Sequence, residues 1–300
     1  MWRTWRCAWC APQGSGATPR SVADVIGSPG AVTSWWHPLR RYVRLYWAVA
    51  RYCLSRELEY RTNLAFNLLR ETVYALLQIA FVDIIFLNVE SIGDWTANRM
   101  LVLMGTYTFV SNTTYALFWE TLTSLSSLIN TGELDLVLTK PVSAQFYVSV
   151  RRIAFMNLAP AAFGIGIAAW GIGRLGITPS FLDVAAYAVL CACAVVTCYA
   201  LWFSSVLGAF WAGRLQNAGA IFEPVVSMAR VPTTSLASPL RLAFTFVLPL
   251  AFVGTVPAQA ILGIAEPWHV PYAIGLAGAL VIASNRLWHR ALRAYSSASS

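Results

Sequence analysis

Long apolar segments constrain this chain more than any other feature. A helix that crosses the hydrocarbon core of a bilayer needs about 20 consecutive, mostly apolar residues. Six segments reach that length: residues 64–87, 100–122, 153–172, 182–207, 240–262 and 270–288. Because 58% of the chain is hydrophobic and only 11% is charged, a soluble core is a poor explanation for them. The sequence therefore predicts an all-α, polytopic integral membrane protein with six transmembrane helices.

The segments that flank and separate these spans have different compositions. Residues 38–62 alternate aromatic and aliphatic side chains with arginines, which predicts an amphipathic helix in the inner headgroup layer. Residues 1–36 lack periodicity and lack the apolar run of a signal peptide, so we expect a disordered cytoplasmic tail. We likewise expect a disordered C-terminus at 296–300, which leaves one membrane domain over 37–295. Residues 209–239 are expected to be too polar to cross the membrane.

The distribution of basic residues predicts the orientation of the spans. With both termini in the cytoplasm, eighteen of the 21 lysines and arginines lie inside, including those of the 209–239 segment and Arg241. Arg99 and Arg174 lie outside, and Arg70 lies within the first span. This asymmetry is the positive-inside pattern. The net charge of +8 is thereby explained without nucleic acid, and we expect no nucleic-acid partner.

The residue types needed for several kinds of catalysis are missing from the sequence. A phosphate-binding loop needs Gly-Lys before Ser or Thr, but the only lysine, Lys140, stands between Thr139 and Pro141. The three histidines are far apart and none has a partner at metal-ligand spacing. We therefore expect no catalytic residues, metal site or cofactor in this chain, and any ATP would be hydrolysed by another subunit.

Charges and prolines inside the predicted spans are candidates for a structural or a pathway role. Arg70 and Glu71 either pair with each other or face a cavity, and Asp83 either reaches the outer interface or faces the same cavity. Pro249 and Pro257 should kink or break the fifth span, which lines a pathway only if it is broken. The alternatives to a membrane subunit driven by a separate ATPase are an ion-driven carrier and a membrane-embedded lipid-modifying enzyme, but the spans hold few acids and histidines for either.

The loop at 130–141 concentrates acidic residues between two spans. Glu133 and Asp135 would begin a short helix, where the helix dipole favours negative charge. Leu134 and Leu138 would be exposed on such a loop, which is typical of a docking site. The simpler alternative is a solvated turn that Gly132 opens and Pro141 ends.

The same loop carries a resemblance to a known family. Residues 131–146, Thr-Gly-Glu-Leu-Asp-Leu-Val-Leu-Thr-Lys-Pro-Val-Ser-Ala-Gln-Phe, resemble the loop of bacterial ABC-2-type permeases with about six spans and a Gly-Glu-Leu-Asp…Pro motif. The run at 246–263 around Pro249 and Pro257, and Phe-Trp-Ala-Gly-Arg at 210–214, are similar to the same branch. The resemblance extends over residues 38–295.

This resemblance implies a permease subunit of an ATP-driven exporter in the bacterial plasma membrane. The loop at 130–141 would be its coupling helix, and the implied residues are Gly132, Glu133, Leu134, Asp135, Leu138, Lys140 and Pro141. Two copies of a separate nucleotide-binding subunit would bind ATP and Mg, and a second permease subunit, identical or a sister protein, would complete the pathway. The Glu-Ala-Ala loop of importers is missing from the sequence, which favours export. Drugs, lipids and glycolipids fit the aromatic-rich spans equally well as substrates.

Overall fold

The computed structural model describes residues 36–59, 61–139, 143–208 and 218–294. The chain divides into two compact units, residues 1–44 and 45–300. The described part of the first unit is the start of α2 (Trp36–Glu59), and all packing reported below lies within the second unit. Residues 1–35 of the predicted tail and the predicted disordered C-terminus at 296–300 lie outside the described residues. Within the described residues the regular structure is helical, with one isolated bridge between Ile92 and Trp95.

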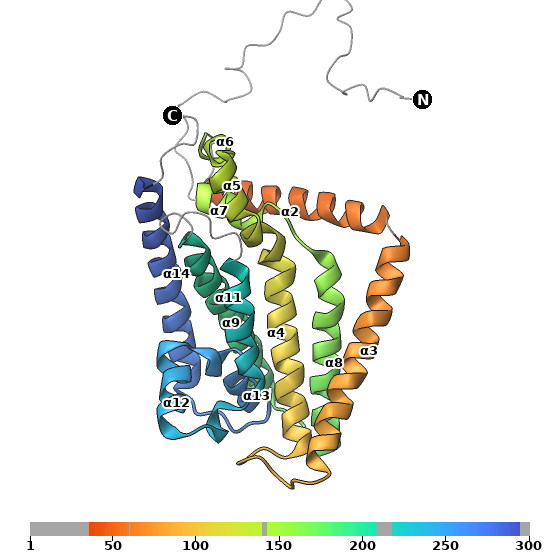
Figure 1. The fold of residues 1–300 in the computed structure, drawn as a ribbon. Coiled ribbons are helices and arrows are strands. Elements are labelled where there is room, and N and C mark those ends of the chain that lie inside the picture. Colours follow the sequence, from red (N-terminus) through yellow and green to blue (C-terminus); the bar gives the residue numbers. More distant parts are fainter. Residues whose placement is uncertain (1–35, 60, 140–142, 209–217, 295–300) are drawn as a thin grey trace, which may run out of the picture. The chain divides into compact units, whose positions relative to one another are not determined.

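Helix α4 (Ala97–Thr123) is the central helix of the second unit (Figure 1). Its 27 residues span about 40 Å at a rise of about 1.5 Å per residue. Residues 100–108 are buried on every side. Its buried hydroxyls donate to carbonyls one turn earlier, as in Thr106 to Val102 (2.7 Å) and Thr114 to Val110 (2.8 Å). These bonds let a helix rich in Ser and Thr occupy the interior of the bundle.

Helix α8 (Leu158–Leu175) packs along α4 at unusually close range. A Cβ atom added to Gly105 would stand 2.4 Å from the backbone nitrogen of Ala168. A Cβ atom added to Gly164 would stand 2.5 Å from the backbone nitrogen of Phe109. Small residues at such a crossing let two helix backbones approach, which is a common means of association in membranes.

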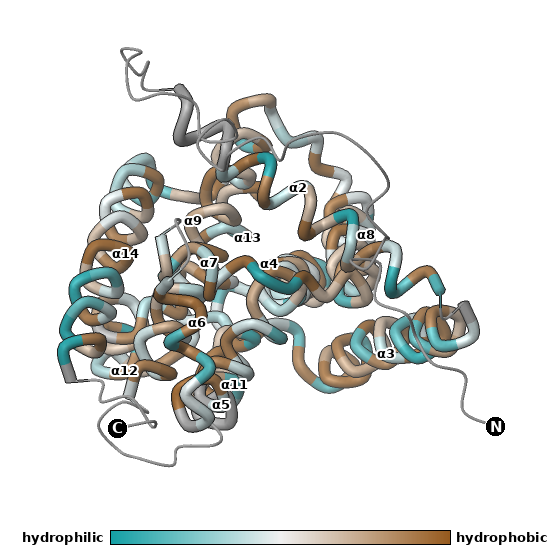
Figure 2. Tube along the Cα trace, turned by 90° about the horizontal axis from the view of Figure 1, so that it is seen from above, coloured by the Kyte–Doolittle hydropathy of each residue, from teal (hydrophilic) through white to brown (hydrophobic). Residues whose placement is uncertain are grey.

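Three further long helices belong to the same bundle: α3 (Arg61–Phe86), α9 (Phe181–Leu207) and α14 (His269–Ala294). Seen along the helix axes, α3 and α14 lie at opposite edges of the bundle with α4 between them (Figure 2). After α4, the short helices α5 (Leu125–Thr131), α6 (Leu134–Leu138) and α7 (Ala144–Val150) lie at one end of the bundle, here called the α5 end. The opposite end, called the α13 end, holds the loop at 87–96 and helix α13 (Thr255–Ile261).

The segment after α9 crosses the bundle, which corrects the prediction for residues 209–239. In α11 (Ala218–Ser227), Phe222 stacks on Trp202 of α9 with ring centroids 4.8 Å apart. Further along, Arg230 lies 5.0 Å from the ring centre of Tyr107 in α4. The indole nitrogen of Trp95 then donates to the hydroxyl of Thr234 (2.8 Å) at the α13 end. Residues 218–235 therefore run beside α4 toward the α13 end, whereas residues 209–217 of the predicted loop lie outside the described residues.

The physical reason for this error is the environment of the polar residues. Glu223 and Arg230 line a polar cavity together with side chains of α3 and α4. Both residues are exposed, so an open polar cavity rather than burial within the protein accommodates their charges. Low hydropathy therefore does not exclude a crossing here.

The predicted fifth span at 240–262 is not a straight helix, because this segment turns back. Before it, the hydroxyl of Ser235 donates to the carbonyl of Ile92 (3.1 Å) at the α13 end. After it, Leu262 packs in the cluster that contains Met100, at the same end. The helical parts Ser238–Phe246 and Leu250–Ile261 meet at 73°, so the break expected near Pro249 is present. The segment enters and leaves at one end, as a re-entrant loop does, and its two helical parts are either such a loop or a broken span.

Hydropathy and length together identify fewer spans than the six expected. In the described part of the chain, three helices are long and apolar enough to cross a membrane: Phe155–Leu175, Phe181–Leu207 and His269–Arg293. The bent pair raises the number to four if it is counted as a span. Helices α3 and α4 are long enough, but α3 carries Arg70, Glu71 and Asp83 and α4 carries many hydroxyls.

Candidate coupling loop and membrane cavities

The predicted coupling loop at 130–141 holds the end of α5 and all of α6, and α7 follows it at the α5 end. Gly132 separates α5 from α6 and has the left-handed conformation, with φ of 76°. Glycine adopts this conformation without the steric cost that a Cβ atom imposes. Lys140 and Pro141, which were predicted to set the exit of the loop, lie outside the described residues.

Helix α6 has one buried and one exposed face. The side chains of Leu134 and Val137 are buried in the main hydrophobic core beside Leu125 and Val148. On the other face, Leu136 is 70% exposed, and Leu138 and Glu133 are also exposed. Asp135 is half-buried. The loop is thus anchored to the bundle and presents an apolar side chain to its surroundings.

The predicted contact residues do not all lie on the exposed face of α6. Leu134 was expected on the contact surface, but it fixes α6 to the core, whereas Glu133, Asp135 and Leu138 remain accessible in whole or part. Leu136 was not among the predicted residues. Its position three residues after Glu133 places both on one face of a helix, so helical spacing could have identified it.

The loop is tied to the ends of the long helices by hydrogen bonds. The hydroxyl of Thr121 near the end of α4 donates to the carbonyl of Arg152 (3.0 Å). The amide of Ala154, which precedes α8, donates to the carbonyl of Ala116 in α4 (2.8 Å). A displacement of the α5–α7 loop would therefore reach both α4 and α8.

Arg151 joins the beginning of this loop to its end. Its guanidinium group donates to the hydroxyl of Ser124, which precedes α5 (2.6 Å). Burial, and then the charge of Arg152, lower the pKa of Arg151, while Tyr147 and Glu133 act in the opposite direction. The hydrogen bond from Arg151 to Ser124 therefore connects the two ends of the α5–α7 segment.

The charged residues predicted within the first span make local ion pairs. Arg70 pairs with Glu71, its neighbour in sequence. Asp83 pairs with Arg174 at the end of α8 (3.3 Å), and both side chains are more than 40% exposed. The geometry of Arg70 and Glu71 agrees with the pairing alternative, and Asp83 lies toward the α13 end as the interface alternative requires. None of these residues is brought together with the coupling loop.

The two predicted prolines lie in the segment that turns back. Pro249 stands at the bend and precedes η5 (Leu250–Phe252), while Pro257 is buried within α13. Gly254 lies between them, and a Cβ atom there would stand 2.6 Å from the carbonyl oxygen of Ala229. The loop is thus packed tightly against the segment that follows α11.

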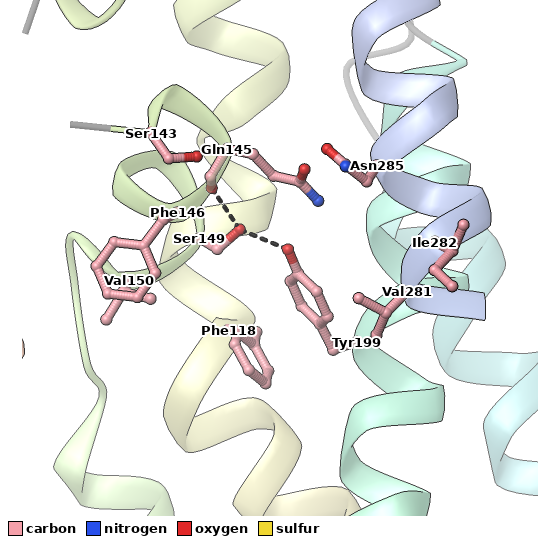
Figure 3. A pocket seen from close by; sticks show the side chains of 10 residues that line it. All are labelled: Phe118, Ser143, Gln145, Phe146, Ser149, Val150, Tyr199, Val281, Ile282 and Asn285. Carbon is pink, nitrogen blue, oxygen red and sulfur yellow. Dashed lines mark hydrogen bonds between the residues drawn. The ribbon is translucent and has the colours of Figure 1, made fainter. Parts of the chain in front are cut away.

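A cavity of about 450 Å³ lies beside α7 (Figure 3). Its walls come from α4, α7, α9 and α14, and its polar atoms include Gln145 and Asn285. The hydroxyls of Ser149 and Tyr199 lie 2.7 Å apart in its wall and connect α7 with α9. Two further cavities lie between α3, α4 and α11, with volumes of about 190 and 800 Å³.

Long apolar helices, a segment that turns back and a short helical loop bonded to two long helices are typical of a helical membrane protein. The sequence matches the family described as ABC-2 family transporter protein over residues 72–299. The chain belongs to this family, and it is a membrane permease of ABC transporters. Comparison with curated proteins and with solved structures returned no match.

Proposed function

We propose that the chain is the permease subunit of an ABC exporter and that a separate ATP-hydrolysing subunit docks on the exposed face of α6. The observation that carries this proposal is the exposure of Leu136 on a loop whose other face is buried in the core. An exposed apolar side chain on an anchored loop supports a protein contact. Glu133, Asp135 and Leu138 complete the contact surface around Leu136, and Lys140 and Pro141 set the exit of the loop.

The α5 end faces the cytoplasm in this proposal. Arginines of the second unit gather there in the second half of α2, between α7 and α8, and at the end of α14: Arg51, Arg56, Arg151, Arg152, Arg290 and Arg293. The α13 end has Arg99, Arg174 and Arg241. The excess of basic residues at the α5 end is what the positive-inside rule expects of a cytoplasmic face.

Six segments cross the membrane in this arrangement: α3, α4, α8, α9, the segment that begins with α11, and α14. The re-entrant loop lies on the outer side, and α2 lies at the inner interface, where its exposed Trp47 and Tyr52 suit the headgroup layer. The six crossings are those expected from the sequence except the fifth, which α11 replaces.

The proposed cycle begins when the partner subunits bind ATP and Mg and close on each other. Their movement displaces α6, and the hydrogen bonds from Thr121 to Arg152 and from Ala154 to Ala116 pass the displacement to α4 and α8. These helices re-orient and open a path at the interface of two permease subunits, identical or sister proteins. ATP hydrolysis resets the loop, and this chain contributes no catalytic group.

The proposal is tested by recovering the tagged full-length protein from bacterial membranes in mild detergent and measuring the nucleotide-binding subunit that comes with it. We expect Leu136→Asp, and separately Glu133→Ala combined with Asp135→Ala, to lower its recovery by about tenfold, the equivalent of about 1.4 kcal/mol. Ile264→Asp is the matched control, because Ile264 is an exposed apolar residue at the α13 end. Unchanged recovery and export in both loop variants would refute the docking site.

A further inference from the structure

Two cavities between α3, α4 and the α11 segment share a wall and differ in polarity. The smaller one has a volume of about 190 Å³ and the larger one about 800 Å³. Their common lining residues are Tyr74, Gln78, Ser227 and Arg230. Because four lining residues are shared, the two cavities adjoin each other.

The smaller cavity is polar and contains an arginine. Besides Arg230 it is lined by hydroxyl and amide side chains of α4, among them Ser111 and Asn112. Arg230 stacks over Tyr107, and no carboxylate of the described residues lies within ion-pair distance of its guanidinium group. Glu223 lines the same cavity but makes no ion pair with Arg230. The guanidinium group therefore has donors to offer an acidic ligand.

The larger cavity is apolar. Its walls are formed mainly by aliphatic, aromatic and thioether side chains: Leu77, Phe81, Ile84, Ile85, Met100 and Met104. Its volume lies within the range of about 300–1,000 Å³ that is usual for small-molecule sites. Methionine side chains adapt their shape to irregular apolar ligands, so the cavity suits a flexible hydrocarbon chain.

We propose that the two cavities form one site for an amphiphile, whose acidic head group binds Arg230 and whose hydrocarbon chain fills the apolar cavity. This inference rests on the proposed export function and names its substrate class. The polar cavity contacts α4 at residues 107–115, nearer the α5 end than Met100 and Met104 of the apolar cavity. An amphiphile in the leaflet on the α5 side has this same head-to-tail direction, so it can enter the site without inverting.

The test is equilibrium binding of two radiolabelled lipids to the full-length protein in neutral detergent. The probes are oleoyl-lysophosphatidate, which has a phosphate head, and monooleoylglycerol, which has the same chain and no charge. We expect the protein to bind the phosphate lipid at least about tenfold more tightly, because hydrogen bonds to charged groups discriminate to this extent. Arg230→Gln should abolish the preference and Arg230→Lys should retain most of it. Arg241→Gln, at the α13 end, is the matched control and should leave the preference unchanged.

Met104→Trp provides a second variant that does not touch the charge. It fills part of the apolar cavity and should weaken binding of both lipids to a similar extent. Equal affinity of the unmodified protein for the two lipids would overturn the proposal, as would an unchanged preference in Arg230→Gln. If Arg230→Gln does not yield folded protein by gel filtration, Met104→Trp decides, and undiminished lipid binding in that variant overturns the proposal.

The alternative to an amphiphile over the two cavities is a second copy of the chain. Cross-linking between two copies through Leu77→Cys, together with failure to bind either lipid, would show that these cavities lie at an interface between two permease subunits. That result would overturn the amphiphile site. Binding is measured without the ATP-hydrolysing subunit. A failed lipid site therefore leaves recovery of that subunit unchanged, and a failed docking site leaves lipid binding unchanged.

Discussion

Gly132 is the residue on which the shape of the coupling loop depends most directly. Its φ of 76° lies in the left-handed region, where a residue with a Cβ atom costs about 1–2 kcal/mol. We expect Gly132→Ala to lower the thermal midpoint of the purified protein and to reduce recovery of the ATP-hydrolysing subunit.

Gly173→Ala in α8 is the control for this substitution. An added Cβ atom at Gly173 meets open space, and alanine favours the helix. An unchanged midpoint and unchanged recovery in Gly132→Ala would show that the loop does not require this conformation.

Part of the candidate site could be read from the sequence at this scale. Gly132, Glu133 and Asp135 follow from the residue types alone, because glycine marks a turn and acids favour a helix start. The roles of Leu134 and Leu136 do not follow from residue type. Both are leucines, and only packing against α5 and α7 decides which one is buried.

At the scale of elements, the contact between α4 and α8 is the tightest helix pair of the bundle. We expect Gly164→Ala to destabilise the protein by about 1–3 kcal/mol, the usual cost of overpacking. The added Cβ atom would meet the backbone of α4, which cannot rotate away as a side chain can. The measurement is the free energy of unfolding in detergent.

Gly166→Ala is the matched control, two residues along the same helix, where an added Cβ atom meets no atom within 4 Å. It should leave the stability unchanged or raise it slightly. Equal effects of the two substitutions would contradict the close approach of α4 and α8.

The sequence predicted five of the long helices close to their observed bounds, because each is an apolar run of the right length. It treated residues 209–239 as one polar loop, whereas residues 218–235 run along the bundle. Hydropathy measures the preference for lipid, and Glu223 and Arg230 line an open polar cavity beside α4. The sequence also predicted one continuous span at residues 240–262. An apolar run broken at Pro249 can turn back as easily as it can cross.

At the scale of the whole molecule, the account depends on the two ends of the bundle facing opposite sides of the membrane. The α5 end carries the loop that we propose as the contact with the ATP-hydrolysing subunit, and the α13 end carries residues 234–238 and the segment that turns back. This arrangement requires the segment that begins with α11 to cross the membrane. The amphiphile site then lies between a helix joined to the coupling loop, α4, and a segment that reaches the opposite side.

The most direct measurement is labelling of single cysteines with a membrane-impermeant maleimide in a variant that lacks the six native cysteines. Thr139→Cys lies at the exposed end of α6, and Ser238→Cys lies at the exposed start of α12 (Ser238–Leu242). The account predicts labelling of Ser238→Cys in intact cells and labelling of Thr139→Cys only after the membrane is opened. Labelling of both positions from the same side would contradict the crossing of α11, and exchange of the two sides would contradict the coupling loop.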